Sequence, residues 1–149
     1  MREWTKDTEI NAPIDQVWKY FEGSLADMQK IMPNVVENQL VKETDEGVGT
    51  IYRQKYREGK RVQEYEVETL IYENEPEYKK MKVGFTLANM FEITATYELK
   101  RLADNKTYFC YTTTNKPLKW FVKLILKLAG SDKVVVQFVE RVKRVAEAE

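Results

Sequence analysis

The chain has 149 residues, a length that suits one compact domain and is short for two, so we expect a single domain over residues 1–149. Hydrophobic residues make up 43% of the chain and charged residues 32%, which excludes the disordered, collagen-like and coiled-coil classes. Lysine plus arginine equals aspartate plus glutamate, at 24 each. Because no net charge draws in nucleic acid, we expect no nucleic-acid partner.

The missing histidine and the single cysteine restrict the chemistry of the chain. Histidine is absent, so Ser-His and Cys-His nucleophiles and zinc sites built on imidazole are excluded. Cys110 is the only cysteine, which rules out an internal disulfide and a cysteine metal cluster. We therefore expect no metal and no cofactor. Neither a secretory signal nor the run of about 18 apolar residues that a spanning helix needs occurs in the sequence, which favours a cytoplasmic protein.

The beginning of the chain predicts one strand and two short helices. Residues 2–11 alternate loosely between apolar and polar side chains, as in a strand. From Ile14 to Phe21 the apolar residues follow the spacing of one helix face, and Gly23 ends this helix. Ser24 is a typical cap for a second short helix, which Pro33 closes.

After Pro33 the spacing of apolar residues falls to two and predicts six strands. The clearest run is 91–99, where apolar residues alternate with glutamate and threonine. Turn-like clusters separate the strands, and turns this short join antiparallel neighbours. One face of each strand is apolar and the other is polar, so we expect a solvated outer face. That outer face is expected to carry Glu64, Glu66, Glu68 and Cys110.

Opposite charges predict the register of two hairpins. A two-residue turn at Glu58-Gly59 and a three-residue turn ending at Glu75 would each put opposite charges side by side on the outer face. Apolar residues would then face one another on the inner side. The predicted pairs are Tyr52 with Tyr65, Arg53 with Glu64, Glu66 with Lys82 and Glu68 with Lys80.

From Lys116 to the end of the chain the pattern predicts a long helix, which Gly130 breaks or bends. Residues 118–129 are too few to span a bilayer, but they combine a wide apolar arc with Trp120 and three lysines. Two interpretations stay open for this segment: packing in the core or in a homodimer contact, and transient contact with a membrane. The chain is accordingly expected to be a monomer or a homodimer. The lysines concerned are Lys119, Lys123 and Lys127.

Several short segments and their order carry a resemblance to a known family. They are Ile10-Asn11-Ala12-Pro13, Val17-Trp18, Met32-Pro33-Asn34-Val35, Gly49-Thr50 and the terminal amphipathic helix. The chain resembles the SRPBCC superfamily, also called START or Bet v 1-like, and within it the polyketide cyclase/dehydrase and lipid transport branch. The resemblance implies an α+β helix-grip fold, in which a curved seven-stranded antiparallel sheet wraps around a long C-terminal helix. It implies a cavity for an apolar or amphipathic molecule but no catalytic residue, because members share architecture and not a reaction.

The inner face of the predicted sheet is enriched in tyrosine. A buried tyrosine needs a hydrogen-bond partner for its hydroxyl, so this face either forms an internal polar network or presents donors to a ligand. Ligand pockets have apolar walls with a few polar groups, which this face would supply. The candidate ligand-binding residues are Tyr52, Gln54, Tyr56, Tyr65, Met81, Phe85, Phe91, Tyr97 and Tyr111 on the sheet, with Phe121 and Ile125 on the terminal helix.

The function that we expect is binding or carriage of a hydrophobic or amphipathic small molecule, lipid-like or aromatic, between the sheet and the C-terminal helix. The alternative is a cyclase or dehydratase that acts on a polyketide-like substrate through a cavity tyrosine and a carboxylate. A third interpretation is a partner protein whose side chains fill the cavity. A carboxylate beside a tyrosine in the cavity would distinguish the enzyme from the carrier.

Overall fold

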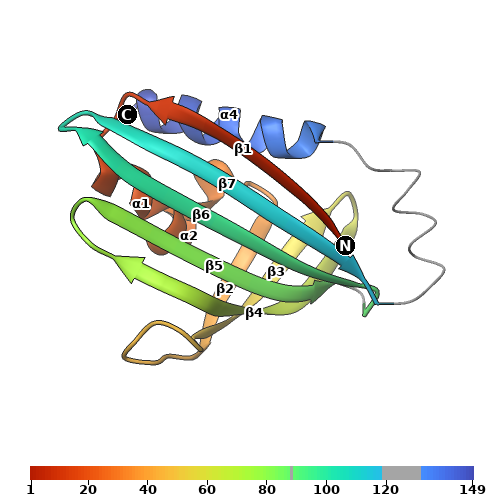
Figure 1. Cartoon of the computed structure of the whole chain (residues 1–149). Helices are drawn as coiled ribbons and strands as arrows, with labels where there is room; N and C mark the ends of the chain where they lie inside the picture. Colours follow the sequence, from red (N-terminus) through yellow and green to blue (C-terminus); the bar gives the residue numbers. More distant parts are fainter. Residues whose placement is uncertain (88, 119–131) are drawn as a thin grey trace.

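The computed structural model describes residues 1–87, 89–118 and 132–149. One antiparallel sheet of seven strands has the order β1-β7-β6-β5-β4-β3-β2 (Figure 1). Its strands are β1 (Arg2–Ile10), β2 (Val35–Lys42), β3 (Ile51–Glu58), β4 (Arg61–Asn74), β5 (Tyr78–Leu87), β6 (Phe91–Ala103) and β7 (Lys106–Pro117). The described helices are α1 (Ile14–Glu22), α2 (Leu25–Ile31) and α4 (Lys133–Glu147). The predicted α+β helix-grip fold is confirmed.

The two short helices follow the signals in the sequence. Pro13 precedes the first residue of α1 with a φ of −61°, and α1 ends before Gly23. The Ser24 hydroxyl accepts a hydrogen bond from the Asp27 backbone N–H at 3.1 Å and so caps α2. Both helices therefore begin and end where the sequence predicts.

The helices cover the concave face of the sheet. Figure 1 shows α4 along β1 at one edge, α1 and α2 behind the middle strands, and β2 and β3 turned back behind them. The core lies where β1 ends, and it joins α1, β6, β7 and α4. Fully buried side chains from these four elements meet there, namely Val17, Leu99, Phe109 and Val142. Each such side chain contributes about 1.5–3 kcal/mol by leaving water. The core thus holds α1 and α4 at one end of the concave face.

The register of the β3–β4 hairpin differs from the prediction by two residues. The turn residues are Gly59 and Lys60, and Gly59 supplies a left-handed conformation with a φ of +61°. The predicted pairing of these strands is wrong, but an even shift leaves the same side chains on the inner face. The observed pairs include Glu58 with Arg61, Tyr52 with Val67, Arg53 with Glu66 and Gln54 with Tyr65.

The predicted β4–β5 register is also wrong, because β4 is 14 residues long and contains a bulge. The register shifts between Thr69 and Ile71, so Leu70 is the extra residue and remains 38% exposed. Before the bulge the odd-numbered side chains of β4 face inward. After the bulge the even-numbered ones do, so Tyr72 faces the inner side. The observed pairs include Glu68 with Gly84, Thr69 with Val83, Tyr72 with Met81 and Glu73 with Lys80.

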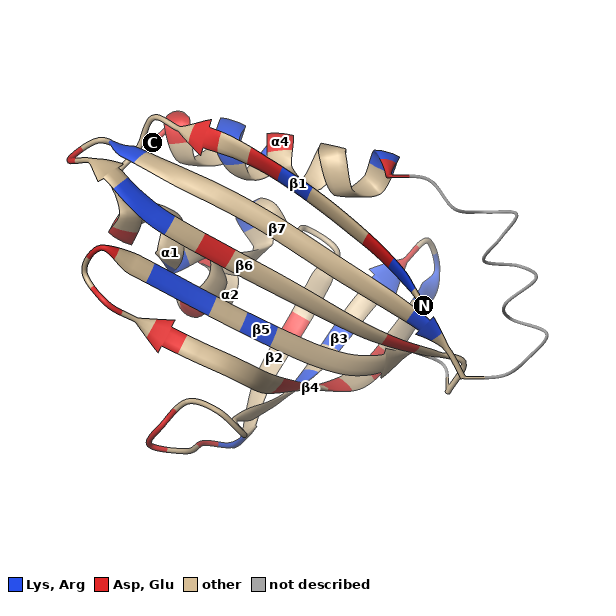
Figure 2. Cartoon of the chain, in the orientation of Figure 1, with Lys and Arg blue, Asp and Glu red and all other residues tan. Residues whose placement is uncertain are grey.

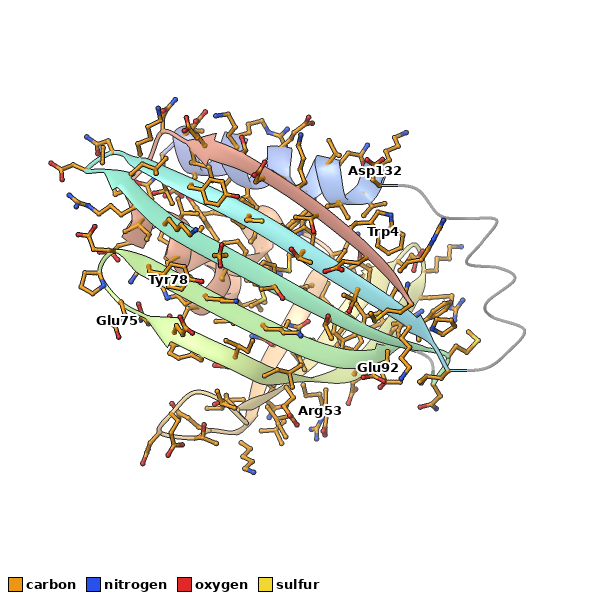
Figure 3. All side chains as sticks on the ribbon, in the orientation of Figure 1. Trp4, Arg53, Glu75, Tyr78, Glu92 and Asp132 are labelled. Carbon is orange, nitrogen blue, oxygen red and sulfur yellow. The ribbon has the colours of Figure 1, made fainter. Side chains whose placement is uncertain are left out.

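The predicted start of the C-terminal helix at Lys116 is wrong, because β7 continues to Pro117. These two residues pair with the first residues of β6, and this pairing holds them in the sheet. α4 follows Asp132, which Figure 3 labels. Among the described helices, none is long and apolar enough to cross a membrane. Apart from Leu118, the segment 118–129 lies outside the described residues, and with it lie Phe121, Ile125, Lys119, Lys123 and Lys127.

The convex face of the sheet is charged, as predicted. Figure 2 shows basic and acidic positions along β5 and β6. Arg53, labelled in Figure 3, lies 3.4 Å from a carboxylate oxygen of Glu64 and 3.9 Å from one of Glu66. Glu68 is exposed beside them, and Cys110 lies opposite Glu98 on the same face. These carboxylates therefore face solvent and not the concave side.

Candidate functional site

A cavity of about 590 Å³ lies inside the concave face of the sheet. Strands β2 to β7 and the helices α1, α2 and α4 contribute side chains to its wall. The volume falls within the roughly 300–1,000 Å³ typical of small-molecule sites. The described side chains leave this space open, which argues against the interpretation of a filled cavity.

The structure brings most of the predicted site residues together at this wall. Phe91 is on the same side of β6, but it pairs with Leu87 and Pro117 at the end of the strand and is not among the described residues that line the cavity. Phe121 and Ile125 lie outside the described residues. The predicted residues that line the cavity are Tyr52, Gln54, Tyr56, Tyr65, Met81, Phe85, Tyr97 and Tyr111.

Aromatic rings form two groups in the wall. The ring centroids of Tyr65 and Phe85 are 4.7 Å apart with 19° between the planes. On the neighbouring strands Tyr97 stacks on Tyr111, and Phe138 of α4 packs 4.7 Å from the Tyr111 centroid. Flat rings at these separations attract one another beyond the area that they bury. They present a rigid apolar surface to anything in the cavity.

Burial keeps the tyrosines of this wall protonated. The pKa of Tyr65 rises to about 12, because burial penalises the charged phenolate. Burial likewise holds the pKa of Tyr97 well above its usual value and raises the pKa of Tyr111. At neutral pH these phenols are therefore hydrogen-bond donors and not general bases.

Polar groups that sequence reasoning missed cluster near α2. Arg141 of α4 lines the cavity, and its Nη1 donates a hydrogen bond to the Ile31 carbonyl at 3.3 Å. Asn38 of β2 also lines the cavity, and its buried Oδ1 has no hydrogen-bond partner among the described residues. Arg141 follows Val134 by seven residues, so helical spacing alone puts both on one side of α4. Nothing local in the sequence says that this side meets a cavity.

A carboxylate and a tyrosine meet where α1 faces β4, again at the wall of the cavity. The Tyr72 hydroxyl donates a hydrogen bond to a Glu22 carboxylate oxygen at 2.6 Å, and the Trp18 indole N–H donates to the other oxygen. Glu22 is exposed. Burial and this hydrogen bond raise the pKa of Tyr72 to about 12. The sequence did not predict the pair, because the bulge at Leu70 decides which way Tyr72 faces.

The loop between β2 and β3 approaches the same tyrosine. Gly47 has a φ of +85°, and a Cβ at this position would lie 2.7 Å from the Tyr72 ring. Glycine is thus required at position 47 for two reasons: the left-handed backbone conformation and the close approach of the loop to the Tyr72 ring. Within the described ranges 1–87, 89–118 and 132–149, no group of three or more Cys, Asp or Glu side chains is arranged to hold a metal ion.

The curled sheet, the helices on its concave face and the hollow between them define a helix-grip protein of the Bet v 1-like class. The family model for polyketide cyclase/dehydrase and lipid transport proteins matches residues 1–147, and the chain belongs to this family. No curated protein sequence matches the chain.

Solved structures share this fold at low sequence identity. The di-domain ARO/CYC BexL from the BE-7585A biosynthetic pathway superposes with a TM-score of 0.73 at 14% identity, over 99% of this chain and 47% of BexL, so the chain spans about half of that protein. The Zhui aromatase/cyclase from Streptomyces sp. R1128 has a TM-score of 0.70 at 12% identity, over 98% of this chain and 93% of that one. Ara h 8.0201 has a TM-score of 0.69 at 12% identity, over 99% of both chains. These similarities concern the fold alone.

Proposed function

We propose that this protein binds or carries a hydrophobic or amphipathic small molecule in the cavity between the sheet and α4. The observation that carries the proposal is a hollow of about 590 Å³ whose wall includes two groups of packed aromatic rings. An empty apolar space costs stability, because the surrounding side chains lose contacts. A ligand that fills it regains those contacts and removes apolar area from water, at roughly 25 cal/mol per Å² before the costs of association.

The polar groups of the wall are better suited to orienting a bound ligand than to catalysing a reaction. The protonated phenols of Tyr65 and Tyr97 supply donors, and the Gln54 amide supplies both a donor and an acceptor. Among the described residues, the Gln54 Nε2 has only a weak contact with the Met28 sulfur, at 3.9 Å. A few convergent polar groups on an apolar wall are the usual pattern of a small-molecule site.

Native mass spectrometry of the purified protein, followed by organic extraction, tests this proposal. We expect a reproducible adduct, or uptake of the neutral dye N-phenylnaphthylamine with 1:1 stoichiometry and enhanced fluorescence. A bare protein mass together with no dye uptake would contradict the proposal.

A matched pair of substitutions on β6 locates the binding. Ala95 lines the cavity and is 5% exposed, whereas Thr96 is on the outer face opposite Lys82 and Thr112. Ala95→Leu adds a bulky side chain to the cavity and should weaken dye binding strongly, while Thr96→Leu should leave it unchanged. Thermal melts of both variants check that each one folds. Equal effects of the two substitutions would mean that the dye does not bind in the cavity.

The second candidate, a cyclase or dehydratase, rests on the contact between Tyr72 and Glu22. A tyrosine that donates to a carboxylate at a cavity wall has the parts of a proton-transfer pair. Two aromatase/cyclase proteins share the fold, which agrees with this alternative. However, Glu22 is exposed and also accepts a hydrogen bond from Trp18, so its contacts suit a structural role that links α1 to β4. Turnover of a polyketide-like substrate that Glu22→Gln and Tyr72→Phe both abolish, with ligand affinity retained, would favour the enzyme.

A further inference from the structure

The cavity wall includes a cation whose charge no described carboxylate balances. Arg141 lines the cavity, and its one hydrogen bond to a described residue is the 3.3 Å contact with the Ile31 carbonyl. Among the described residues, no aspartate or glutamate oxygen lies within 4.0 Å of its guanidinium. A guanidinium has five N–H donors in a planar fork that matches a carboxylate. Most of these donors therefore have no partner among the described residues and suit a ligand.

Two basic side chains near Arg141 on the same helix, Lys143 and Arg144, behave differently. Lys143 is paired with Glu147 at 2.9 Å and donates to the Glu9 carbonyl. Arg144 is exposed and does not line the cavity. Arg141 is half-buried, where holding an unpaired charge costs more than at the surface. A bound anion would offset this cost.

Neutral amides surround the same part of the cavity. Ile31, which accepts from Arg141, is one helical turn from Met28, whose sulfur is 3.9 Å from Gln54 Nε2. Gln54 lies opposite Asn38 in the β2–β3 pairing, and both side chains line the cavity. The Asn38 amide keeps a buried atom without a partner among the described residues, and its O and N positions are interchangeable by rotation. Arg141, Gln54 and Asn38 can therefore all direct N–H donors toward one ligand group.

The acidic residues of the wall lie at the other end of β3. Glu22 and Glu43 both act on Tyr52, whose pKa is raised chiefly by burial and then by these charges. Tyr56, four residues along β3, instead contacts the Asn34 amide beyond the end of α2. Four residues of strand span roughly 13 Å. The cavity wall is therefore acidic near the β2–β3 loop and rich in hydrogen-bond donors beside α2.

We propose that the ligand carries a singly charged oxyacid group, a carboxylate or a sulfonate, which Arg141 binds with help from Gln54 and Asn38. Its apolar body then lies against the packed rings of Tyr97 and Tyr111 on the sheet and Phe138 on α4. The inference rests on the proposed function and specifies the ligand class. It distinguishes an amphipathic acid from a neutral lipid or an amine.

Two dyes with the same aromatic body test this inference. Anilinonaphthalene sulfonate carries the anion, and N-phenylnaphthylamine is its neutral counterpart. Arg141→Gln should weaken sulfonate binding about tenfold, the typical loss when a charged hydrogen-bond partner is removed, and should change neutral-dye binding by less than about twofold. Arg141→Lys should retain part of the preference for the anion, because it keeps the charge but not the fork. The exposed Arg144→Gln is the matched control and should change neither affinity.

A competition arm replaces the dye anion with a natural acid group. Dodecanoate should displace bound dye from the unmodified protein at a concentration about tenfold lower than dodecanol, and Arg141→Gln should remove that difference. If both dyes bind the unmodified protein and Arg141→Gln affects them equally, the inference is wrong and the proposed function stands. If Arg144→Gln weakens sulfonate binding as much as Arg141→Gln, the anion binds at the surface and the inference also fails. If neither dye nor dodecanoate binds, the proposed function falls, and the inference falls with it.

Discussion

Tyr97 stacks on Tyr111 with 5.6 Å between the ring centroids and 9° between the planes. The two residues are direct partners in the β6–β7 register, and Phe138 of α4 packs against both rings. Phe21 of α1 adds a further contact, 4.5 Å from the Tyr97 centroid. This cluster joins the core to the cavity, so we expect a change in its rings to affect both stability and the proposed ligand binding.

Truncation of Tyr97 should separate the contribution of its ring from that of its hydroxyl. Tyr97→Ala should lower the free energy of unfolding by about 3–5 kcal/mol, because a large buried ring is removed. Tyr97→Phe should cost less than about 1 kcal/mol, since no hydrogen bond joins this hydroxyl to a described residue. Urea unfolding followed by tryptophan fluorescence measures both. A loss from Tyr97→Phe as large as that from Tyr97→Ala would mean that the hydroxyl has a partner essential to the fold.

Two glycines with positive φ provide a matched test of the contact between the β2–β3 loop and Tyr72. Gly59→Ala should cost about 1 kcal/mol for its left-handed backbone alone, because its added Cβ meets nothing within 4 Å. Gly47→Ala carries the same backbone cost and also drives a Cβ to within 2.7 Å of the Tyr72 ring, so about 1–3 kcal/mol more should be lost. Chemical unfolding of the two variants gives the difference. Equal losses would show that the loop moves away from Tyr72 without cost.

Lys79 is a cation on the inner face with only 6% of its side chain exposed. It donates to the Asn74 side-chain oxygen, lies 6.0 Å from the centre of the Trp18 ring, and pairs with the exposed Asp15 at 3.3 Å. Asp15→Asn should cost no more than about 1 kcal/mol, because water screens an exposed partner. Lys79→Met should be within about 1 kcal/mol of the original protein, because it keeps the packed stem and removes the buried charge.

Calorimetry of these variants and of Lys79→Ala checks the account. Lys79→Ala should be the least stable of the three, since it deletes the stem that packs beneath α1. If Lys79→Met proved as destabilising as Lys79→Ala, the ammonium group would be making a net contribution that packing does not explain.

Glu149 should give the fold a pH-dependent contribution to stability. Its carboxylate accepts from Lys19 at 2.6 Å and from Lys30 at 2.7 Å, and these contacts lower its pKa from 4.5 to about 2. A carboxyl group with a depressed pKa stabilises the folded state above its unfolded pKa and loses that effect as the pH falls through the folded one. Glu149→Gln should therefore lower the melting temperature at pH 7, and the difference should shrink between pH 4.5 and pH 2.

A double-mutant comparison isolates the ion pairs of Glu149. In a background of Lys19→Gln and Lys30→Gln, Glu149→Gln should have a much smaller effect, because both lysine partners of the carboxylate are gone and only its contact with Tyr20 remains. A difference that persists in this background, or that is the same at every pH, would assign the stabilisation to contacts other than these two lysines.

Local patterns were sufficient to predict most of the sheet aromatics that line the cavity. Alternation along each strand placed Tyr52, Tyr65 and Tyr97 on one face. The predicted β3–β4 register was wrong by two residues, and a shift of two leaves each side chain on its face. Helix ends at Gly23 and Ser24 followed from backbone freedom and capping, which depend on near neighbours in the chain. The helix predicted from Lys116 failed for the opposite reason, because pairing with β6 overrode the local pattern.

The sequence by itself thus determined the sheet, its apolar face and the two short helices, since each depends on residues within a turn or a strand of one another. Only the tertiary structure decided that Tyr72 meets Glu22 and that Arg141 and Asn38 share a cavity. One bulged residue at Leu70 changes which face of β4 follows it, and no local signal marks that residue. The position of Arg141 depends on how α4 docks on the sheet, which long-range packing sets. Arg141 and Asn38, to which we assign part of the binding of the acid group of the proposed ligand, are therefore residues that the linear pattern could not predict.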